Sequence, residues 1–85
     1  MGSPGDRTVR VTLVGRTGCH LCDLARESVA AVTGELGVDF EEIDIDAHPA
    51  LLARWADKIP VTLVDGVEHD HWWVDPGRLR AALQA

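Results

Sequence analysis

Hydrophobic residues follow two different periods along the chain, and the changes of period mark the expected elements. Residues 8–14 alternate at first and then become continuously apolar, which is typical of a β-strand entering a core. After a turn at residues 15–18, apolar residues recur every three or four positions from residue 22 to residue 36, as on one face of an amphipathic helix. Gly34 or Gly37 is expected to end this helix, because glycine readily adopts the left-handed conformation of a helix stop.

A second strand is expected after this helix, but its apolar positions change face partway along. Val38 and Phe40 share one face, whereas Ile43 and Ile45 share the other. This change predicts a bulge or a late start of the strand within residues 38–45. The acidic residues at the remaining positions favour an exposed edge of the sheet.

The last forty residues predict a short helix, a hairpin and a final helix. Pro49 suits the first position of the short helix, and Asp75-Pro76 is an N-cap followed by a first-turn proline. Asp65-Gly66 lies between β-rich runs at 61–64 and 67–73, which is a strong hairpin signal. The order β-α-β-α-β-β-α, with a parallel crossover first and an antiparallel hairpin last, predicts an α/β fold with a mixed four-stranded sheet and flanking helices.

Composition and charge narrow the class of protein. The 85 residues are 46% hydrophobic and 26% charged, which is typical of one globular domain, expected over residues 8–85 after a disordered tail at 1–7. The formal net charge of −6 argues against a nucleic-acid partner. With no apparent signal peptide or membrane span, we expect a cytoplasmic protein that is monomeric and makes no membrane contact.

The candidate chemistry lies where the first strand meets the first helix, at Cys19 and Cys22. Two thiols three positions apart on a helical turn lie near the Cα separation of about 5.5–6 Å that a disulfide favours. The unpaired N–H groups and the dipole of a helix start stabilise a thiolate, so we predict a lowered pKa and a nucleophilic role for Cys19. Cys22, one turn further in, is expected to be less exposed and to act as the resolving thiol.

Other roles for the cysteine pair stay open. The two thiols could be buried structural groups, or part of a tetrahedral zinc site completed by His69 and His71. A cluster bridged between two chains through Cys19 is a further alternative. In those cases the protein would be a non-catalytic module that binds a metal or a partner protein, and a thiol redox sensor is a third class.

The cysteine motif and three others together resemble the thioredoxin fold, and within it the small bacterial glutaredoxin-like proteins. The matching motifs are Gly18-Cys19-His20-Leu21-Cys22-Asp23, Ile43-Asp44-Ile45-Asp46, Ile59-Pro60-Val61 and Asp65-Gly66. The resemblance covers residues 8–84 and implies a thiol–disulfide oxidoreductase with no bound cofactor or metal. It implies a disulfide-containing protein or a small thiol as substrate, and a reducing thiol system as electron donor. It also implies that Pro60 is cis, lies against the cysteines and exposes the backbone of Ile59 to the substrate.

Three departures from the glutaredoxin pattern bear on the electron donor. His20-Leu21 stands where glutaredoxins usually carry Pro-Tyr, and Lys58 stands where they carry Thr. The Gly-Gly and Cys/Ser-Asp element that holds glutathione is replaced by His-Trp-Trp-Val-Asp at residues 71–75. The reductant therefore stays open between glutathione and a thioredoxin system.

Four side chains are weighed as contacts beside the cysteines. The fork of Arg16 could hold the thiolate or a substrate carboxylate, and a protonated His20 would favour the thiolate; both residues also suit a solvated surface. Trp72 and Trp73 alternate faces on the expected strand, so one should fill the core and the other should form a wall for the substrate, with Trp73 as the candidate. Asp44 and Asp46 are expected to be edge charge and a helix cap.

Overall fold

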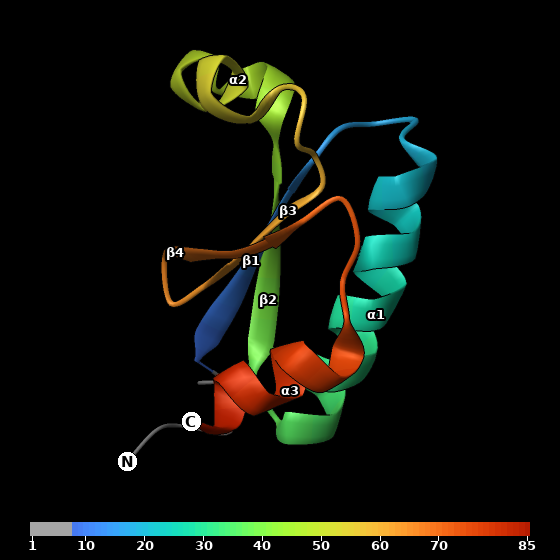
Figure 1. The fold of residues 1–85 in the computed structure, drawn as a ribbon, viewed down its shortest axis with the longest axis vertical. Helices are drawn as coiled ribbons and strands as arrows, with labels where there is room; N and C mark the ends of the chain where they lie inside the picture. The colour runs from blue at the N-terminus through green and yellow to red at the C-terminus, as the bar shows by residue number, and fades with distance from the viewer. Residues whose placement is uncertain (1–7) are drawn as a thin grey trace.

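The computed structural model describes residues 8–85, and within them it contains the seven predicted elements in the predicted order (Figure 1). They are β1 (Val9–Gly15), α1 (His20–Leu36), β2 (Asp39–Asp44), α2 (Pro49–Trp55), β3 (Val61–Val64), β4 (Val67–His71) and α3 (Pro76–Gln84). A 3-10 turn that the sequence did not predict, η1 (Ile45–Ala47), joins β2 to α2. The tail expected at residues 1–7 lies outside the described residues.

The four strands form one mixed sheet in the order β2-β1-β3-β4. β1 and β2 run parallel and β3 pairs antiparallel with β4, as the sequence predicts. β1 also pairs antiparallel with β3. The acidic strand β2 lies at one edge, which confirms the expectation drawn from its charges. β1 is therefore a central strand, and its carboxyl end presents the loop that carries the cysteines.

Two hydrophobic clusters hold the helices against the sheet. The first includes Val11, Val29 and Leu79 and joins the sheet to α1 and α3; the second includes Val14 and Trp55 and joins it to α2. Both faces of the central strand are thus covered, which explains why β1 becomes continuously apolar.

The same two clusters explain the change of parity in β2. Val38 and Phe40 pack on the first cluster, whereas Ile43 and Ile45 belong to the second. The strand begins late, at Asp39, and the only irregularity in its pairing with β1 lies at its start. The apolar residues change face because the two ends of the strand are covered by different helices.

The local stop and turn signals have the predicted effects. Gly37, with φ of 70°, ends α1, and its N–H donates to the carbonyl of Gly34. The side chain of Asp75 accepts hydrogen bonds from the first turn of α3. Asp65 and Gly66 both have positive φ, as a tight hairpin requires. Within residues 8–85, no helix has the length and apolar character needed to cross a lipid bilayer.

The prediction that one tryptophan fills the core is wrong. β4 ends at His71, and Trp72 has φ of 67°, so the two tryptophans lie in a turn after the strand and do not alternate on it. Both tryptophans are exposed, Trp72 to 45% and Trp73 to 67%. The turn is fixed by the hydrogen bond from the Trp72 N–H to the Pro60 carbonyl, at 2.7 Å.

The packing of α3 on α1 predicts a large loss of stability on truncation of Leu79. This side chain is fully buried, so Leu79→Ala should leave a cavity and lower the free energy of unfolding by about 2–5 kcal/mol. Leu24→Ala, on the half-exposed side of α1, should change it by about 0.5 kcal/mol. Urea denaturation of both variants measures the difference; equal losses would contradict this assignment of the core.

Candidate active site

A short loop after the central strand positions the two cysteines. β1 ends at Gly15, the chain reverses through Gly18 with φ of 76°, and Cys19 becomes the N-cap residue of α1. Cys19 has extended backbone angles and its carbonyl accepts the first helical hydrogen bond, from the Asp23 N–H. The predicted junction of strand and helix therefore falls at the first cysteine.

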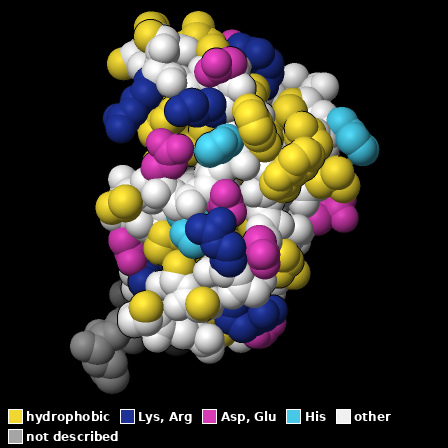
Figure 2. Space-filling model, viewed as in Figure 1, with side chains coloured by type: hydrophobic (Ala, Val, Ile, Leu, Met, Phe, Trp, Pro, Cys, Tyr) yellow, Lys and Arg dark blue, Asp and Glu magenta, His cyan; other side chains and the backbone are white. Residues whose placement is uncertain are grey.

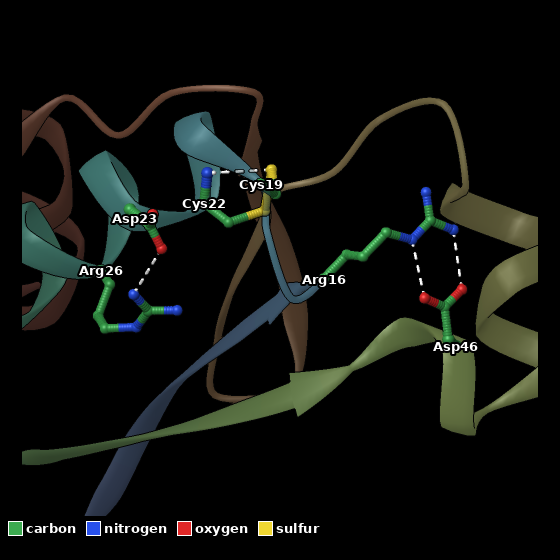
Figure 3. Close-up of a disulfide and its surroundings, with 6 residues drawn as sticks. All are labelled: Arg16, Cys19, Cys22, Asp23, Arg26 and Asp46. Atoms are coloured by element: carbon green, nitrogen blue, oxygen red, sulfur yellow. Dashed lines mark hydrogen bonds and ion pairs between the residues drawn. A yellow bond between two sulfur atoms is a disulfide. The ribbon is translucent and has the colours of Figure 1, made fainter.

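Cys19 and Cys22 form a disulfide with a Cα–Cα distance of 5.2 Å (Figure 3). The Cys19 sulfur also accepts a hydrogen bond from the Cys22 N–H at 3.2 Å, in the position where a serine or aspartate oxygen usually caps a helix. Cys22 is 1% exposed, whereas Cys19 is partly exposed, as predicted. Cys19 is therefore the more accessible residue of the pair.

The buried cysteine is packed against the end of β1. A Cβ placed on Gly15 would lie 3.0 Å from the Cys22 sulfur and 3.2 Å from its Cβ. A side chain at this position would therefore have to displace Cys22 or the strand. Gly15 allows the helix to approach the sheet closely at the disulfide, a requirement that the sequence alone did not reveal.

Arg16 extends away from the sulfurs and toward Asp46 (Figure 3). Its guanidinium donates two hydrogen bonds of 2.9 Å to the two carboxylate oxygens of Asp46, which lies in η1. These hydrogen bonds lower the pKa of Asp46 and raise that of Arg16. The side chain of Asp44 accepts a hydrogen bond from the Asp46 N–H and so caps η1, a turn that the sequence did not predict. No local pattern indicated that Asp46 would hold the loop of the cysteines.

A charged cavity of about 220 Å³ reaches the buried cysteine from the side of β2. Its lining includes Gly15, Arg16, Cys22, Arg26, Glu42 and Asp44. Arg26 donates to Glu42 at 2.6 Å and to Asp23 at 2.9 Å, and these contacts raise its pKa. Sequence reasoning missed Arg26 and Glu42, because they lie on different elements sixteen positions apart.

An apolar groove lies on the other side of the helix start. Leu21, Leu24 and Ala25 of α1 line one wall, and Trp72, Trp73 and Val74 line the other. Trp72 in turn contacts the loop before β3, since its N–H donates to Pro60 and its indole N–H donates to the Asp57 carbonyl at 3.1 Å. The structure thus brings the predicted residue Trp73 to the first turns of the helix that begins at Cys19.

The predicted residues Ile59 and Pro60 directly precede β3. The peptide bond between them is cis. The ladder between β3 and β4 starts at the pair Val61–His71, so Ile59 lies outside it. His20, the first residue of α1, is exposed beside Cys19.

The zinc alternative finds no matching geometry in the described chain. Within residues 8–85, no three His, Cys, Asp or Glu side chains are placed to share a metal ion. His71 lies 3.8 Å from Glu68, and the partly buried His69 does not join the cysteines.

Comparisons with known proteins identify a family that matches this chain. Residues 10–84 match the family described as "Glutaredoxin-like domain (DUF836)". An uncharacterized protein of Mycobacterium tuberculosis is 43% identical over 79 residues, with 87% of this chain and 81% of that protein covered. A structural-genomics target from X. campestris is 36% identical, with a TM-score of 0.71 and 87% and 95% of the two chains covered.

More distant solved structures share the architecture. A protein from Nitrosomonas europaea is 26% identical, with a TM-score of 0.75 over 96% of this chain and 98% of that one. A mutant thioredoxin from Halobacterium salinarum has a TM-score of 0.64 at 20% identity, covering 93% of this chain and 74% of its own. The thioredoxin likeness concerns the fold alone, and it confirms the predicted thioredoxin-like architecture.

The contact between Gly15 and Cys22 predicts opposite effects of two glycine-to-alanine changes. Gly15→Ala should lower the free energy of unfolding by about 1–3 kcal/mol, because the added methyl group overpacks a buried site. Gly34→Ala, in α1 with open space around it, should raise it by about 0.5–1 kcal/mol through helix propensity. Denaturant unfolding of both variants under oxidising conditions tests this, and a neutral Gly15→Ala would contradict the close approach.

The Arg16–Asp46 pair predicts a specific change in carboxyl titration. The pair favours the charged form of Asp46 in the folded protein, so its contribution to stability is complete above the ordinary pKa of 3.8 and is lost as the pH falls through the lower folded pKa. Arg16→Gln should therefore raise the pKa of Asp46, measured by carbon NMR of the carboxyl groups. Asp65, which pairs with Arg10, is the internal control and should not move. An unchanged Asp46 midpoint would mean that the pair does not form in solution.

Proposed function

Because the chain belongs to the family of glutaredoxin-like domains, we propose that it is a thiol–disulfide oxidoreductase that uses Cys19 and Cys22 in a dithiol mechanism. The observation that carries the proposal is the position of Cys19 as the N-cap of α1, with the Cys22 N–H donating to its sulfur. In the reduced protein the same donor and the helix dipole would stabilise a thiolate at Cys19.

The proposed cycle moves two electrons from the protein to the substrate. The Cys19 thiolate attacks one sulfur of a substrate disulfide, forms a mixed disulfide and releases the other substrate sulfur as a thiolate. Cys22 loses its proton and attacks the Cys19 sulfur, which breaks the mixed disulfide and releases the second substrate thiolate. The released thiolates take up protons, and the Cys19–Cys22 disulfide remains.

A thiol donor must then reduce this disulfide to complete the cycle. Two thiols of the donor are oxidised to a disulfide while the cysteine pair regains two electrons. Glutathione and a thioredoxin system both fit this requirement by chemistry. The tryptophan turn that replaces the glycine-rich glutathione-binding element favours a donor other than glutathione.

We assign the predicted neighbours of the cysteines to the substrate. The exposed His20 adjoins Cys19, and Arg16 lines the cavity that reaches Cys22. Ile59 lies beyond the end of the β3–β4 ladder, which supports a role in which its backbone pairs with an extended substrate. The Pro60 carbonyl accepts the hydrogen bond from Trp72 that holds the turn of Trp72 and Trp73. In this proposal the two cysteines are the catalytic residues. The substrate contacts are Arg16, His20, Ile59, Pro60 and Trp73.

The two cysteines should respond differently to replacement by serine. Cys19→Ser should lower disulfide reduction to the uncatalysed rate, because the exposed nucleophile is lost. Cys22→Ser should form a mixed disulfide with the substrate that persists, because the resolving thiol is missing. Turnover of a small disulfide and mass spectrometry of the trapped adduct measure the two effects; equal residual turnover in both variants would contradict the assigned roles.

Mass spectrometry of the unmodified protein separates this proposal from its alternatives. Oxidation of the pair should lower the mass by that of two hydrogen atoms, and Cys19 should be alkylated at neutral pH faster than a free thiol. One bound zinc ion per chain would favour a metal-binding module. The oxidised mass without turnover would favour a redox sensor.

A further inference from the structure

We infer that the apolar groove beside Cys19 receives an apolar side chain from a neutral or basic polypeptide, so that protein disulfides are reduced in preference to disulfides of small acidic thiols. The inference rests on the proposed function and adds the class of substrate to it. The groove is the surface between Leu21, Leu24 and Ala25 of α1 and Trp72, Trp73 and Val74 of the turn after β4.

The groove lies beside the first turns of the helix that Cys19 caps. Leu21 is two residues beyond Cys19, in the first turn of α1, where successive residues rise only about 1.5 Å. Figure 2 shows hydrophobic side chains gathered over the part of the molecule where α1 begins. Four of the six large hydrophobic residues exposed within 8–85 line this one groove. Apolar surface concentrated beside a reactive group is typical of a binding surface.

One wall of the groove is fixed before any substrate arrives. The Trp72 backbone is tied to Pro60 at 2.7 Å and its indole N–H to the Asp57 carbonyl at 3.1 Å. Its ring also packs edge to face with His71, with ring centroids 4.8 Å apart. A pre-formed aromatic wall loses little conformational entropy on binding, and tryptophan side chains carry much of the binding energy in protein interfaces.

The size and lining of the groove indicate what it can hold. Its volume of about 80 Å³ is small and suits part of one side chain. Within the described chain its lining contains no charged side chain, and Ser28 is its polar member. A carboxylate in this groove would lose water without gaining a cationic partner, which is unfavourable. The groove therefore selects an apolar group.

The charge around the groove indicates the rest of the partner. Glu27 follows Leu24 by one helical turn and, in the described chain, makes no ion pair. Asp57 and Lys58 on the opposite loop carry opposite charges, and the whole protein has a net charge of −6. This field repels an acidic thiol such as a glutamyl peptide and attracts a basic segment, which raises the rate of encounter.

Three disulfide-linked peptides of one length test the inference. One carries Leu and Arg beside its cysteine, the second Leu and Gln, and the third Asp and Gln; hydroxyethyl disulfide serves as a substrate without side chains. For the wild-type protein, kcat/KM should be at least about tenfold higher for either Leu peptide than for the Asp peptide. The Arg peptide should lose more of its rate than the Gln peptide when salt is raised.

Two matched pairs of variants test whether the groove and its charged neighbour cause these substrate preferences. Trp73→Ala should lower kcat/KM for both Leu peptides by about tenfold more than it lowers kcat/KM for hydroxyethyl disulfide. Val67→Ala, which truncates an equally exposed residue in β4 at the hairpin, should change neither. Glu27→Gln should reduce the salt dependence of the Arg peptide, whereas Glu41→Gln, on the edge strand β2, should not.

The outcomes separate this inference from the proposed function. Equal kcat/KM for the Leu and Asp peptides, or equal losses in Trp73→Ala and Val67→Ala, would overturn the inference while reduction of hydroxyethyl disulfide continued. If Trp73→Ala slowed hydroxyethyl disulfide as much as the Leu peptides, Trp73 would act on Cys19 and not on the substrate, which also overturns it. No reduction of any disulfide by the wild-type protein would instead overturn the proposed function.

Discussion

The hydrogen bond from the Cys22 N–H to the Cys19 sulfur is the contact on which the site depends. It exists because Cys19 occupies the N-cap of α1, where the first N–H groups of the helix lack backbone partners. A sulfur in this place takes the role that serine, threonine or aspartate usually has. The group that begins the helix is therefore also the group that would react, and any change to the helix start would change the chemistry.

The surrounding structure holds this contact in place from three directions. Gly18 turns the chain into the helix, Gly15 lets Cys22 pack against the end of β1, and the Arg16–Asp46 pair ties the loop to η1. The cluster between the sheet, α1 and α3 fixes the helix itself. Because the supports come from different elements, the cap geometry depends on the whole fold and not on the four-residue motif alone.

The two sides of the cysteine pair have different chemistry. The cavity that reaches Cys22 is lined by arginine and carboxylate groups that are paired with one another, whereas the groove beside Cys19 is apolar. The apolar groove thus lies beside the first turns of the helix that Cys19 caps, and the buried Cys22 lines the charged cavity. The helix start therefore offers a substrate an apolar surface on one side and a charged surface on the other.

Local sequence determined most of the fold and the position of the cysteine pair in it. Strand and helix periods, the stops at Gly37 and Asp65-Gly66 and the cap at Asp75 act within a few residues, so their effects could be predicted from neighbours in the chain. The position of Cys19 at a helix start followed from the same signals. Likewise, the sequence motifs were sufficient to indicate the glutaredoxin-like family.

Only the tertiary structure decided which distant residues meet. Arg16 pairs with Asp46 thirty positions away, and the face change in β2 follows from helices that cover its two ends separately. The positive φ of Trp72 places both tryptophans on the surface, although strand alternation predicted one in the core. These features depend on long-range packing and on one backbone angle, neither of which leaves a periodic signal in the sequence.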